Sequence, residues 1–276
     1  HLARLLRELS GESRLCVAGG VALNRLMNRR LGSDSGFGEV FFMPIAGDGG
    51  TPWGAALYSY HHSEGGSDRY PLRDLYLGPD YSDAEIEAAL KGLPYRRSAT
   101  VAADAAKHLA EGKIVGWFQG RMEAGPRALG NRSILADPTR SDMKDRLNAR
   151  VKRREGFRPF APAVPVEECA RYFELPKGLE SPYMMLIGNV REDMRSRLPA
   201  ISHADGTARV QTVRREQNPR FYELLEEFGK RKGVPVLLNT SFNENEPIVC
   251  TPRDAVDCSQ RAGMDVLAIG DYLVEK

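Results

Sequence analysis

Three arginines within twelve residues, Arg121, Arg127 and Arg132, are the strongest chemical signal in the sequence. A guanidinium group binds phosphate or carboxylate oxygens through two parallel hydrogen bonds. Gly125 and Gly130 lie between these arginines, and glycine permits an irregular backbone. The three side chains can therefore converge without helical periodicity. The stretch predicts a site for a multiply charged anion.

A second basic stretch follows, in which Lys152 and Arg154 precede an apolar Pro/Phe block. Residues 113–158 carry twelve basic and five acidic residues, although the net charge of the whole chain is only +2. Any one arginine could be a solvated surface charge, but a solvated stripe does not need this glycine and proline punctuation. A concentrated basic segment in a nearly neutral chain favours a focused anion site over a general nucleic-acid coat.

Two glycine-rich motifs occur near the start of the chain. The first joins an apolar strand to a helix at Gly19 and Gly20 and continues to Asn24, so that N–H groups at a helix start could contact a phosphate. A tight turn without a ligand is the alternative. The second places Asp48 at a strand end among glycines, where its carboxylate could bind a metal, orient a nucleotide or cap the next helix.

Two polar motifs lie in the second half of the chain. Alternation over residues 207–213 predicts a strand with Thr207, Arg209 and Gln211 on one face, preceded by His203. Such a face suits a nucleotide, and an exposed edge strand is the alternative.

The other motif follows a predicted buried strand at residues 234–238. It contains Asn239, Ser241 and Asn243, whose amide and hydroxyl groups can hold phosphate oxygens or an adenine edge. A capped turn is the alternative reading of these residues.

The elements around these motifs indicate two fold classes. We expect an α/β arrangement first, with helices over residues 2–9, 21–31 and 51–62 and strands over 14–18 and 40–44. Residues 63–82 are the expected linker. An α+β arrangement follows, with helices over 82–90, 101–111, 143–151 and 219–232 and strands over 114–118, 207–213 and 234–238.

The composition of the 276 residues, 42% hydrophobic and 28% charged, is that of a soluble globular protein. No apolar run approaches the roughly 20 residues of a membrane helix. Four scattered cysteines without a Cys-x-x-Cys pair indicate a reduced, cytoplasmic protein. The five histidines include no pair at i and i+4, so a complete metal cage is not predicted. Because the chain opens inside a helical pattern without Met, we expect a fragment.

The sequence at residues 120–135 resembles a motif of O-carbamoyltransferases of the nodulation, cephalosporin and tobramycin-modifying type; it reads Gly-Arg-Met-Glu-Ala-Gly-Pro-Arg-Ala-Leu-Gly-Asn-Arg-Ser-Ile-Leu. Residues 158–162 and 237–243 support the resemblance. Residues 1–66 resemble the C-terminal part of an actin/Hsp70-like (RNase H-like) α/β domain. Residues 67–276 are similar to a YrdC-like α+β domain with a twisted mixed sheet.

The resemblance implies that the YrdC-like domain binds ATP, Mg²⁺ and carbamoyl phosphate and forms carbamoyl adenylate with release of pyrophosphate. A large domain then transfers the carbamoyl group to a hydroxyl of a small-molecule acceptor, beside Fe²⁺ or another divalent metal held by two His and an Asp. Asp48 matches that Asp, and the His pair is not in this chain. We therefore expect a partial enzyme that is competent for the activation step.

The residues expected to contact carbamoyl phosphate and the polyphosphate are Arg121, Arg127, Arg132, Lys152 and Arg154. Those expected to contact the nucleotide are Gly19, Gly20, Asn24, His203, Thr207, Arg209, Gln211, Asn239, Ser241 and Asn243.

Two other functions fit parts of the sequence. A carbamoyl- or threonylcarbamoyl-adenylate synthase of hydrogenase or tRNA maturation would share the chemistry, but the former would add acylphosphatase-like and zinc-finger segments and the latter would lack residues 14–61. A basic RNA-binding module would need more aromatic stacking residues than this stretch carries. We expect neither a nucleic-acid nor a membrane partner, and we consider a homodimer.

Overall fold

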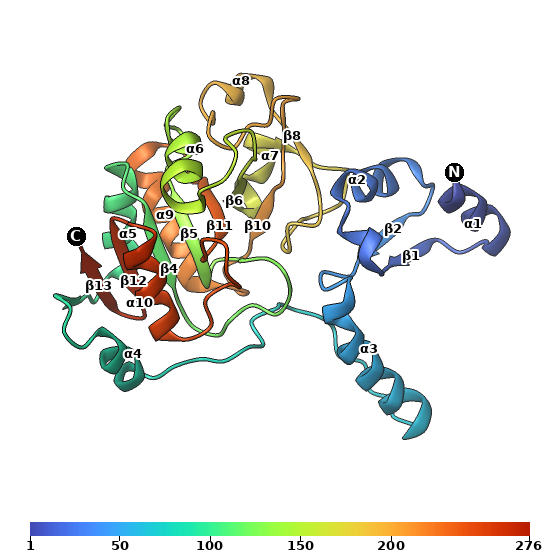
Figure 1. Cartoon of the computed structure of the whole chain (residues 1–276). Helices are drawn as coiled ribbons and strands as arrows, with labels where there is room; N and C mark the ends of the chain where they lie inside the picture. The colour runs from blue at the N-terminus through green and yellow to red at the C-terminus, as the bar shows by residue number, and fades with distance from the viewer.

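The first elements of the chain form a small α/β unit, which we call the N-terminal unit, around two parallel strands, β1 (Arg14–Val17) and β2 (Glu39–Phe42). The computed structural model describes all residues from 1 to 276. Three helices accompany the strands, α1 (Leu2–Ser10), α2 (Arg25–Asp34) and α3 (Thr51–Tyr58), and α3 continues as a π-helical turn at Ser59–Ser63. In Figure 1 this unit lies to the right of the larger sheet, and α3 projects away from it.

The helix predicted over residues 21–31 is present, but its predicted first residue is wrong. Residues Gly20–Leu23 form a 3₁₀ turn, and the helix begins after Asn24, whose side chain accepts a hydrogen bond from the Met27 backbone N–H at 3.2 Å. Asparagine at this position satisfies one of the free N–H groups of the first turn. The capping chemistry of Asn24 therefore decides where the helix begins.

An eight-stranded mixed sheet forms the centre of the rest of the chain, in the order β10-β6-β11-β5-β4-β12-β13-β3. The β10–β6 and β12–β4 pairs are parallel and the others are antiparallel. Its strands are β3 (Arg96–Arg97), β4 (Val115–Phe118), β5 (Arg132–Ala136), β6 (Ala161–Pro165), β10 (Gln211–Val213), β11 (Leu237–Ser241), β12 (Val266–Ile269) and β13 (Tyr272–Glu275). The predicted mixed α/β class is confirmed.

Helices cover both faces of this sheet. Helices α5 (Val101–Ala110) and α9 (Pro219–Lys232) pack together on one face, where they bury Trp117 and Leu135. The other face buries Phe118 and Ile134 in a second core. That core is covered by α4 (Asp83–Leu90), α6 (Met143–Arg146) and α10 (Pro252–Arg261). Successive residues of a strand point to opposite faces, so one apolar strand supplies both cores.

One helix start, one helix body and one strand can be compared with the predictions. Ser82 caps α4 in a capping box with Glu85, as its spacing predicts. The predicted helix at 143–151 is α-helical only to Arg146 and continues as a π-type turn over Leu147–Lys152. The predicted strand at 234–238 lies three residues later, so that Asn239 is inside β11 instead of after it.

The predicted strand at 207–213 is wrong, because the chain changes sheets in the middle of it. Strand β9 (Thr207–Ala208) belongs to a three-stranded sheet with β7 (Phe173–Glu174) and β8 (Gly188–Val190), whereas β10 belongs to the large sheet. Short helices α7 (Cys169–Tyr172) and α8 (Glu192–Arg195) flank this small sheet. Arg209 lies between β9 and β10, where the chain passes from one sheet to the other, and it belongs to neither strand.

The N-terminal unit contacts the rest of the chain through two apolar clusters. Ile45 packs with Leu129 and Met184, and Phe42 packs with Met185 and Leu186. These contacts seat the unit against the loop before β5 and the segment after residue 181. The division between residues 66 and 67 stays a prediction. No helix is both long enough and apolar enough to cross a membrane.

The loop between β4 and β5 depends on Gly130. Its φ is +110°, and a Cβ at this position would overlap the ring of Phe221. The Trp117 indole N–H donates to the Gly130 carbonyl at 2.8 Å, so α9 and β4 hold the loop from two sides. Only glycine fits both the dihedral angle and the space.

We predict that Gly130→Ala lowers the free energy of unfolding by about 2–5 kcal/mol, from the left-handed backbone and the overlap together. Gly233→Ala is the matched control: its φ is +69°, but nothing lies near its Cβ position. The control should lose about 1–2 kcal/mol. Urea unfolding measures both variants. An equal loss in the two would show that contact with Phe221 does not constrain the loop.

Candidate anion-binding site

A cavity of about 200 Å³ gathers arginines from separate parts of the chain. Arg127 comes from the β4–β5 loop, Arg154 from just after the π-type turn and Arg209 from the β9–β10 crossing. The other polar residues lining it are Arg158, Asn239, Thr240 and Ser241. Residues over one hundred positions apart thus contribute to one concave surface.

The cavity contains an excess of uncompensated positive charge. Arg127 and Arg209 have buried Nε atoms with no hydrogen-bond partner. The nearby Arg150 and Arg153 pair with Asp265 and Glu244 at 2.9 Å, but none of the cavity arginines forms an ion pair. Buried charges without partners are costly. The cavity therefore has the electrostatics of a site that a polyanion would complete.

The pKa directions agree with this charge distribution. Burial lowers the pKa of Arg127. Burial, followed by the positive charges of Arg25 and Arg127, lowers the pKa of Arg209 well below its usual range. Burial and then Arg158 lower the pKa of Arg154. Each guanidinium disfavours the protonated form of its neighbours, and a bound anion would reverse that effect.

Neutral amides hold the backbone on which Arg127 sits. The Asn239 amide donates to Gln211 Oε1 at 2.7 Å and to the Ala128 carbonyl at 3.3 Å. The Gln211 amide donates to the Leu129 carbonyl at 2.8 Å. Both side chains are buried, and the Asn239 Oδ1 has no partner. Asn239 therefore both supports the loop and lines the cavity.

Glu123, which the sequence reasoning missed, organises the same loop. Its Oε1 accepts the backbone N–H groups of Leu129 at 2.6 Å, Asn131 at 2.7 Å and Arg132 at 3.2 Å. Burial raises the pKa of Glu123, and these hydrogen bonds oppose the rise. The available signal was one acidic residue inside a run of arginines, placed to accept from the loop backbone.

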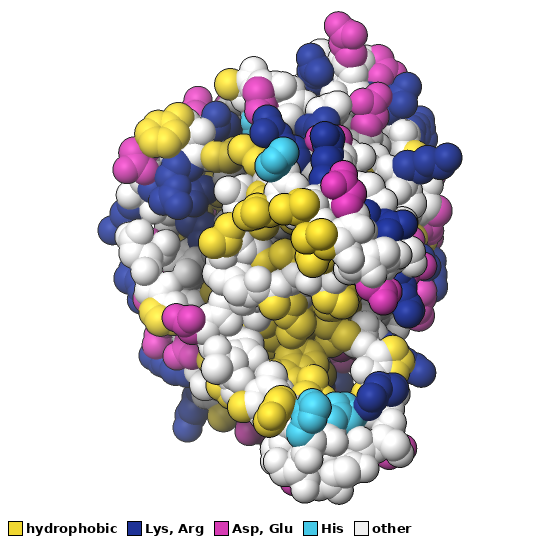
Figure 2. Space-filling view, turned by 90° about the vertical axis from the view of Figure 1, so that its right-hand side faces the viewer, with side chains coloured by type: hydrophobic (Ala, Val, Ile, Leu, Met, Phe, Trp, Pro, Cys, Tyr) yellow, Lys and Arg dark blue, Asp and Glu magenta, His cyan; other side chains and the backbone are white.

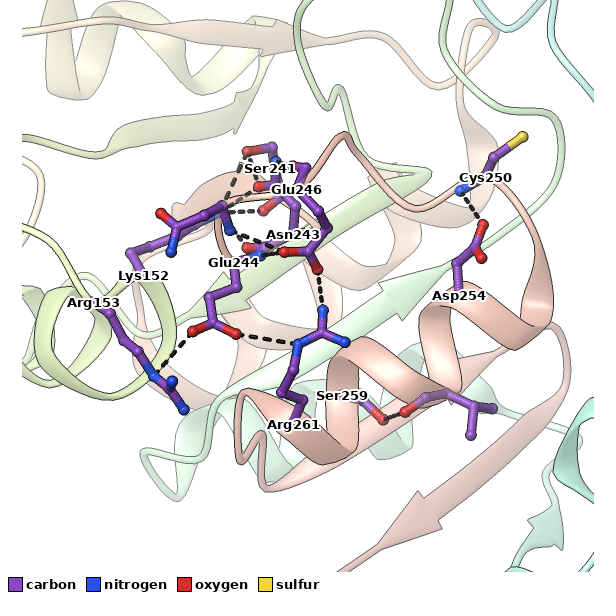
Figure 3. A network of polar contacts seen from close by, with 12 residues as sticks. Lys152, Arg153, Ser241, Asn243, Glu244, Glu246, Cys250, Asp254, Ser259 and Arg261 are labelled. Atoms are coloured by element: carbon purple, nitrogen blue, oxygen red, sulfur yellow. Dashed lines mark hydrogen bonds and ion pairs between the residues drawn. The ribbon is translucent and has the colours of Figure 1, made fainter.

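Lys152 lies against the end of β11, beside Ser241 and Asn243 (Figure 3). Its ammonium donates to the carbonyls of Ser241 and Asn243 and to Asn243 Oδ1, each at 2.7 Å. Burial, and then the charge of Arg154, lower the pKa of Lys152 to about 7. Figure 3 also shows Glu244 between Arg153 and Arg261. Lys152 thus fixes the end of β11, where Ser241 meets the cavity, and does not line the cavity itself.

Two predicted anion ligands lie elsewhere. Arg121 donates to the carbonyls of Leu77 at 2.9 Å and Gly78 at 3.0 Å, so it ties down the linker segment. Arg132 is fully buried, donates to the Gln119 carbonyl at 2.7 Å and stacks on the Phe118 ring at 3.6 Å. Both guanidinium groups already serve backbone carbonyls, and the structure does not bring them to the cavity.

His203 and Thr207 are also outside the cavity wall. The His203 Nδ1 and Thr207 Oγ1 lie 3.0 Å apart, and the Thr207 hydroxyl donates to Asp205 at 2.7 Å. Burial lowers the pKa of His203. The change of sheet after Ala208 separates these residues from Gln211, which is why the predicted common face does not form.

Gly19, Gly20 and Asp48 share a different hollow, of about 510 Å³, in the N-terminal unit. Most of its wall is apolar, including Phe41 and Trp53, and Figure 2 shows apolar surface exposed on this face. Asn24 is not part of it, because it caps α2. Asp48 is the one acidic residue in the wall, and nowhere do three His, Cys, Asp or Glu residues meet as a metal site. A metal at Asp48 would need further ligands.

Comparison with known proteins shows the family to which the chain belongs. The carbamoyltransferase C-terminus family model matches residues 106–276, and the carbamoyltransferase N-terminus model matches residues 2–57. Nodulation protein NolNO of Sinorhizobium fredii is 46% identical over 100% of this chain and 42% of its own length. Nodulation protein NolO of Bradyrhizobium diazoefficiens is 44% identical, with 100% and 52% covered. The 3'-hydroxymethylcephem-O-carbamoyltransferase of Amycolatopsis lactamdurans is 37% identical, with 96% and 49% covered.

The chain thus spans about half the length of the curated relatives it matches. Among solved structures, full-length HypF in its phosphate- and nucleotide-bound form is similar with a TM-score of 0.41 and 20% identity, over 66% of this chain and 22% of that one.

We predict that Arg209→Leu raises the free energy of unfolding by about 1–3 kcal/mol in buffer of low ionic strength without phosphate, because it removes an unpaired charge from a positive cluster. Pyrophosphate should then stabilise the wild type more than this variant. Thermal and urea unfolding measure both effects. Arg214→Leu, which breaks an exposed pair with Glu180, should not stabilise. A destabilised Arg209→Leu would contradict the charge argument.

The lowered pKa of Lys152 predicts a pH dependence. The pKa is about 7 in the folded chain against 10.5 ordinarily, so between these values the unfolded chain binds more protons. The free energy of unfolding of the wild type should therefore rise with pH in this window, relative to Lys152→Met, and stay level below pH 7. Urea unfolding across the window measures it, with exposed Lys91→Met as control. A constant difference between wild type and Lys152→Met would contradict the shift.

Proposed function

We propose that this chain, which belongs to the carbamoyltransferase family, catalyses the ATP-dependent activation of a carbamoyl group at the arginine cavity. The observation that carries the proposal is the set of guanidinium groups around one cavity that lack any carboxylate partner. Carbamoyl phosphate and the ATP polyphosphate bring several negative charges together. A site with prearranged positive charge can neutralise them and align the reacting groups.

The size of the cavity suggests that it holds the phosphate groups of the ligands but not the nucleoside. Pockets for drug-sized molecules measure about 300–1,000 Å³. At about 200 Å³, this cavity suits phosphate groups better than a whole nucleotide. We propose that it holds carbamoyl phosphate and the phosphates of ATP next to one another, with the nucleoside outside the arginine cluster. Asn239 and Ser241 in its wall supply neutral partners for oxygen atoms.

The proposed reaction forms carbamoyl adenylate in two balanced steps. Water opens carbamoyl phosphate to carbamate and phosphate. A carbamate oxygen then attacks the α-phosphorus of ATP, a new P–O bond forms, and the bond from the α-phosphorus to the bridging oxygen of pyrophosphate breaks. The arginines hold the phosphate oxygens throughout, and the charge of the leaving pyrophosphate is stabilised where it develops. No side-chain nucleophile takes part.

Metal ions enter the proposal only as bound partners. Mg²⁺ would neutralise part of the phosphate charge when it is bound together with ATP. Asp48 would be one ligand of a divalent metal in the N-terminal unit. Transfer of the carbamoyl group to a hydroxyl of a small acceptor is the activity that one relative's name states, 3'-hydroxymethylcephem-O-carbamoyltransferase. Since this chain spans about half of that relative, we limit the proposal to activation.

We predict that the chain exchanges labelled pyrophosphate into ATP only when carbamoyl phosphate is present. Arg127→Ala should lower the exchange rate by about 100-fold or more, because one charge-stabilising group is worth roughly 3 kcal/mol in the transition state. Arg140→Ala removes an exposed arginine paired with Asp142 and should leave the rate unchanged. Exchange that is absent in the wild type, or unaffected by Arg127→Ala, would overturn the proposed function.

A further inference from the structure

One arginine of the N-terminal unit lies against the wall of the cavity. Arg25 is the first residue of α2, and its Nε donates to the Met184 carbonyl at 2.9 Å. Met184 lines the arginine cavity. Arg25 is therefore one hydrogen bond away from the cavity wall, although it is over one hundred residues from Arg127 in the sequence.

The free end of this side chain has no partner. The Nη2 of Arg25 is buried and makes no hydrogen bond, like the Nε atoms of Arg127 and Arg209. The Arg25, Arg127 and Arg209 nitrogens come from α2, the β4–β5 loop and the β9–β10 crossing, and a fourth buried guanidinium nitrogen without a partner, the Nε of Arg132, lies outside the cavity lining. Burial and then the charge of Arg127 lower the pKa of Arg25 to about 10, and Arg25 in turn lowers that of Arg209. Such mutual effects place Arg25 within the same positive cluster.

The segment between the two parts is held in a strained shape. Met184 has φ +57°, one of two non-glycine residues with positive φ. The Asn28 side chain, one turn after Arg25 on α2, donates to the Met185 carbonyl at 3.0 Å. A left-handed backbone at a non-glycine residue persists only where its surroundings enforce it. Arg25 and Asn28 are the polar groups of α2 that do so here.

We propose that Arg25 binds the phosphate of the ligand in the arginine cavity, so that this ligand is held by the N-terminal unit and the large-sheet part together. The inference rests on the proposed function, because it assigns a further residue to that same site. The free Nη2 supplies an unused donor next to Met184, which lines the cavity. Arg158 is exposed and Arg154 is already bonded to Asn148 at 2.8 Å.

Such a shared ligand couples the two parts of the chain. A phosphate that binds Arg25 favours the arrangement in which α2 is seated on Met184, and the seated arrangement favours the phosphate to the same degree. Release of the anion leaves the positive cluster uncompensated and weakens the contact with α2. Occupancy of the activation cavity is thereby transmitted to the N-terminal unit, where Asp48 and the glycine-rich hollow lie.

The test uses the full 276-residue chain, inorganic pyrophosphate as the ligand and isothermal titration calorimetry. Arg25→Ala should weaken binding about ten- to hundredfold, the worth of one charged hydrogen bond. Arg30→Ala removes the same charge from an exposed position on the same helix and should change binding less than twofold. Hydrogen exchange gives the second readout. Pyrophosphate should protect the amides of residues 25–34 in the wild type but not in Arg25→Ala.

The outcomes separate this inference from the proposed function. If Arg25→Ala binds pyrophosphate as Arg30→Ala does, and Arg127→Ala does not bind it, the inference is wrong and the cavity stands. If the wild type itself does not bind pyrophosphate, the proposed function fails first. Arg25→Lys, which keeps the charge but loses the fork that can bond Met184 and a phosphate at once, should recover binding only in part.

Discussion

Unpaired positive charge around one cavity is the feature on which the rest of the structure depends. Arg127, Arg154 and Arg209 are brought together without carboxylates, and the protein must hold them against their repulsion. Two buried supports hold the loop that carries Arg127. One is the neutral Asn239–Gln211 amide pair. The other is the Glu123 carboxylate, which accepts hydrogen bonds from backbone N–H groups and not from the cavity arginines. A carboxylate inside the cavity would stabilise the empty protein and compete with the anion.

That arrangement places binding and stability in opposition. The same arginine that would hold a phosphate destabilises the ligand-free fold, so the ligand supplies the missing interaction and stabilises the folded chain. Two residues with positive φ lie near these arginines: Met184 lines the cavity, and Gly130 lies in the same loop as Arg127. Surrounding contacts, such as Phe221 against Gly130 and Asn28 on Met185, over-determine the backbone there. Rigid packing keeps the charges in place when no anion is present.

Local sequence was informative where neighbouring residues decide the outcome. The Ser82 capping box follows from spacing because its hydrogen bonds join residues three positions apart, and strand β4 follows from its run of consecutive apolar residues. Arg121 and Arg127, by contrast, lie six residues apart in the same glycine-containing segment, yet one binds the Gly78 carbonyl and the other lines the cavity. Distant segments decide which backbone carbonyls an arginine can reach, and the spacing of residues in the sequence does not contain this information.

By itself, the sequence determined that a concentrated basic, glycine-punctuated segment lies within a mixed α/β chain and that it resembles the carbamoyltransferases. Charge and local backbone freedom are properties of consecutive residues, so they can be read directly. Only the tertiary structure decided which arginines share a cavity, that Arg209 sits at a change of sheet, and that Arg25 approaches from α2. Those facts depend on contacts between residues far apart in the chain, which are fixed when the two apolar cores and the clusters around Ile45 and Phe42 pack.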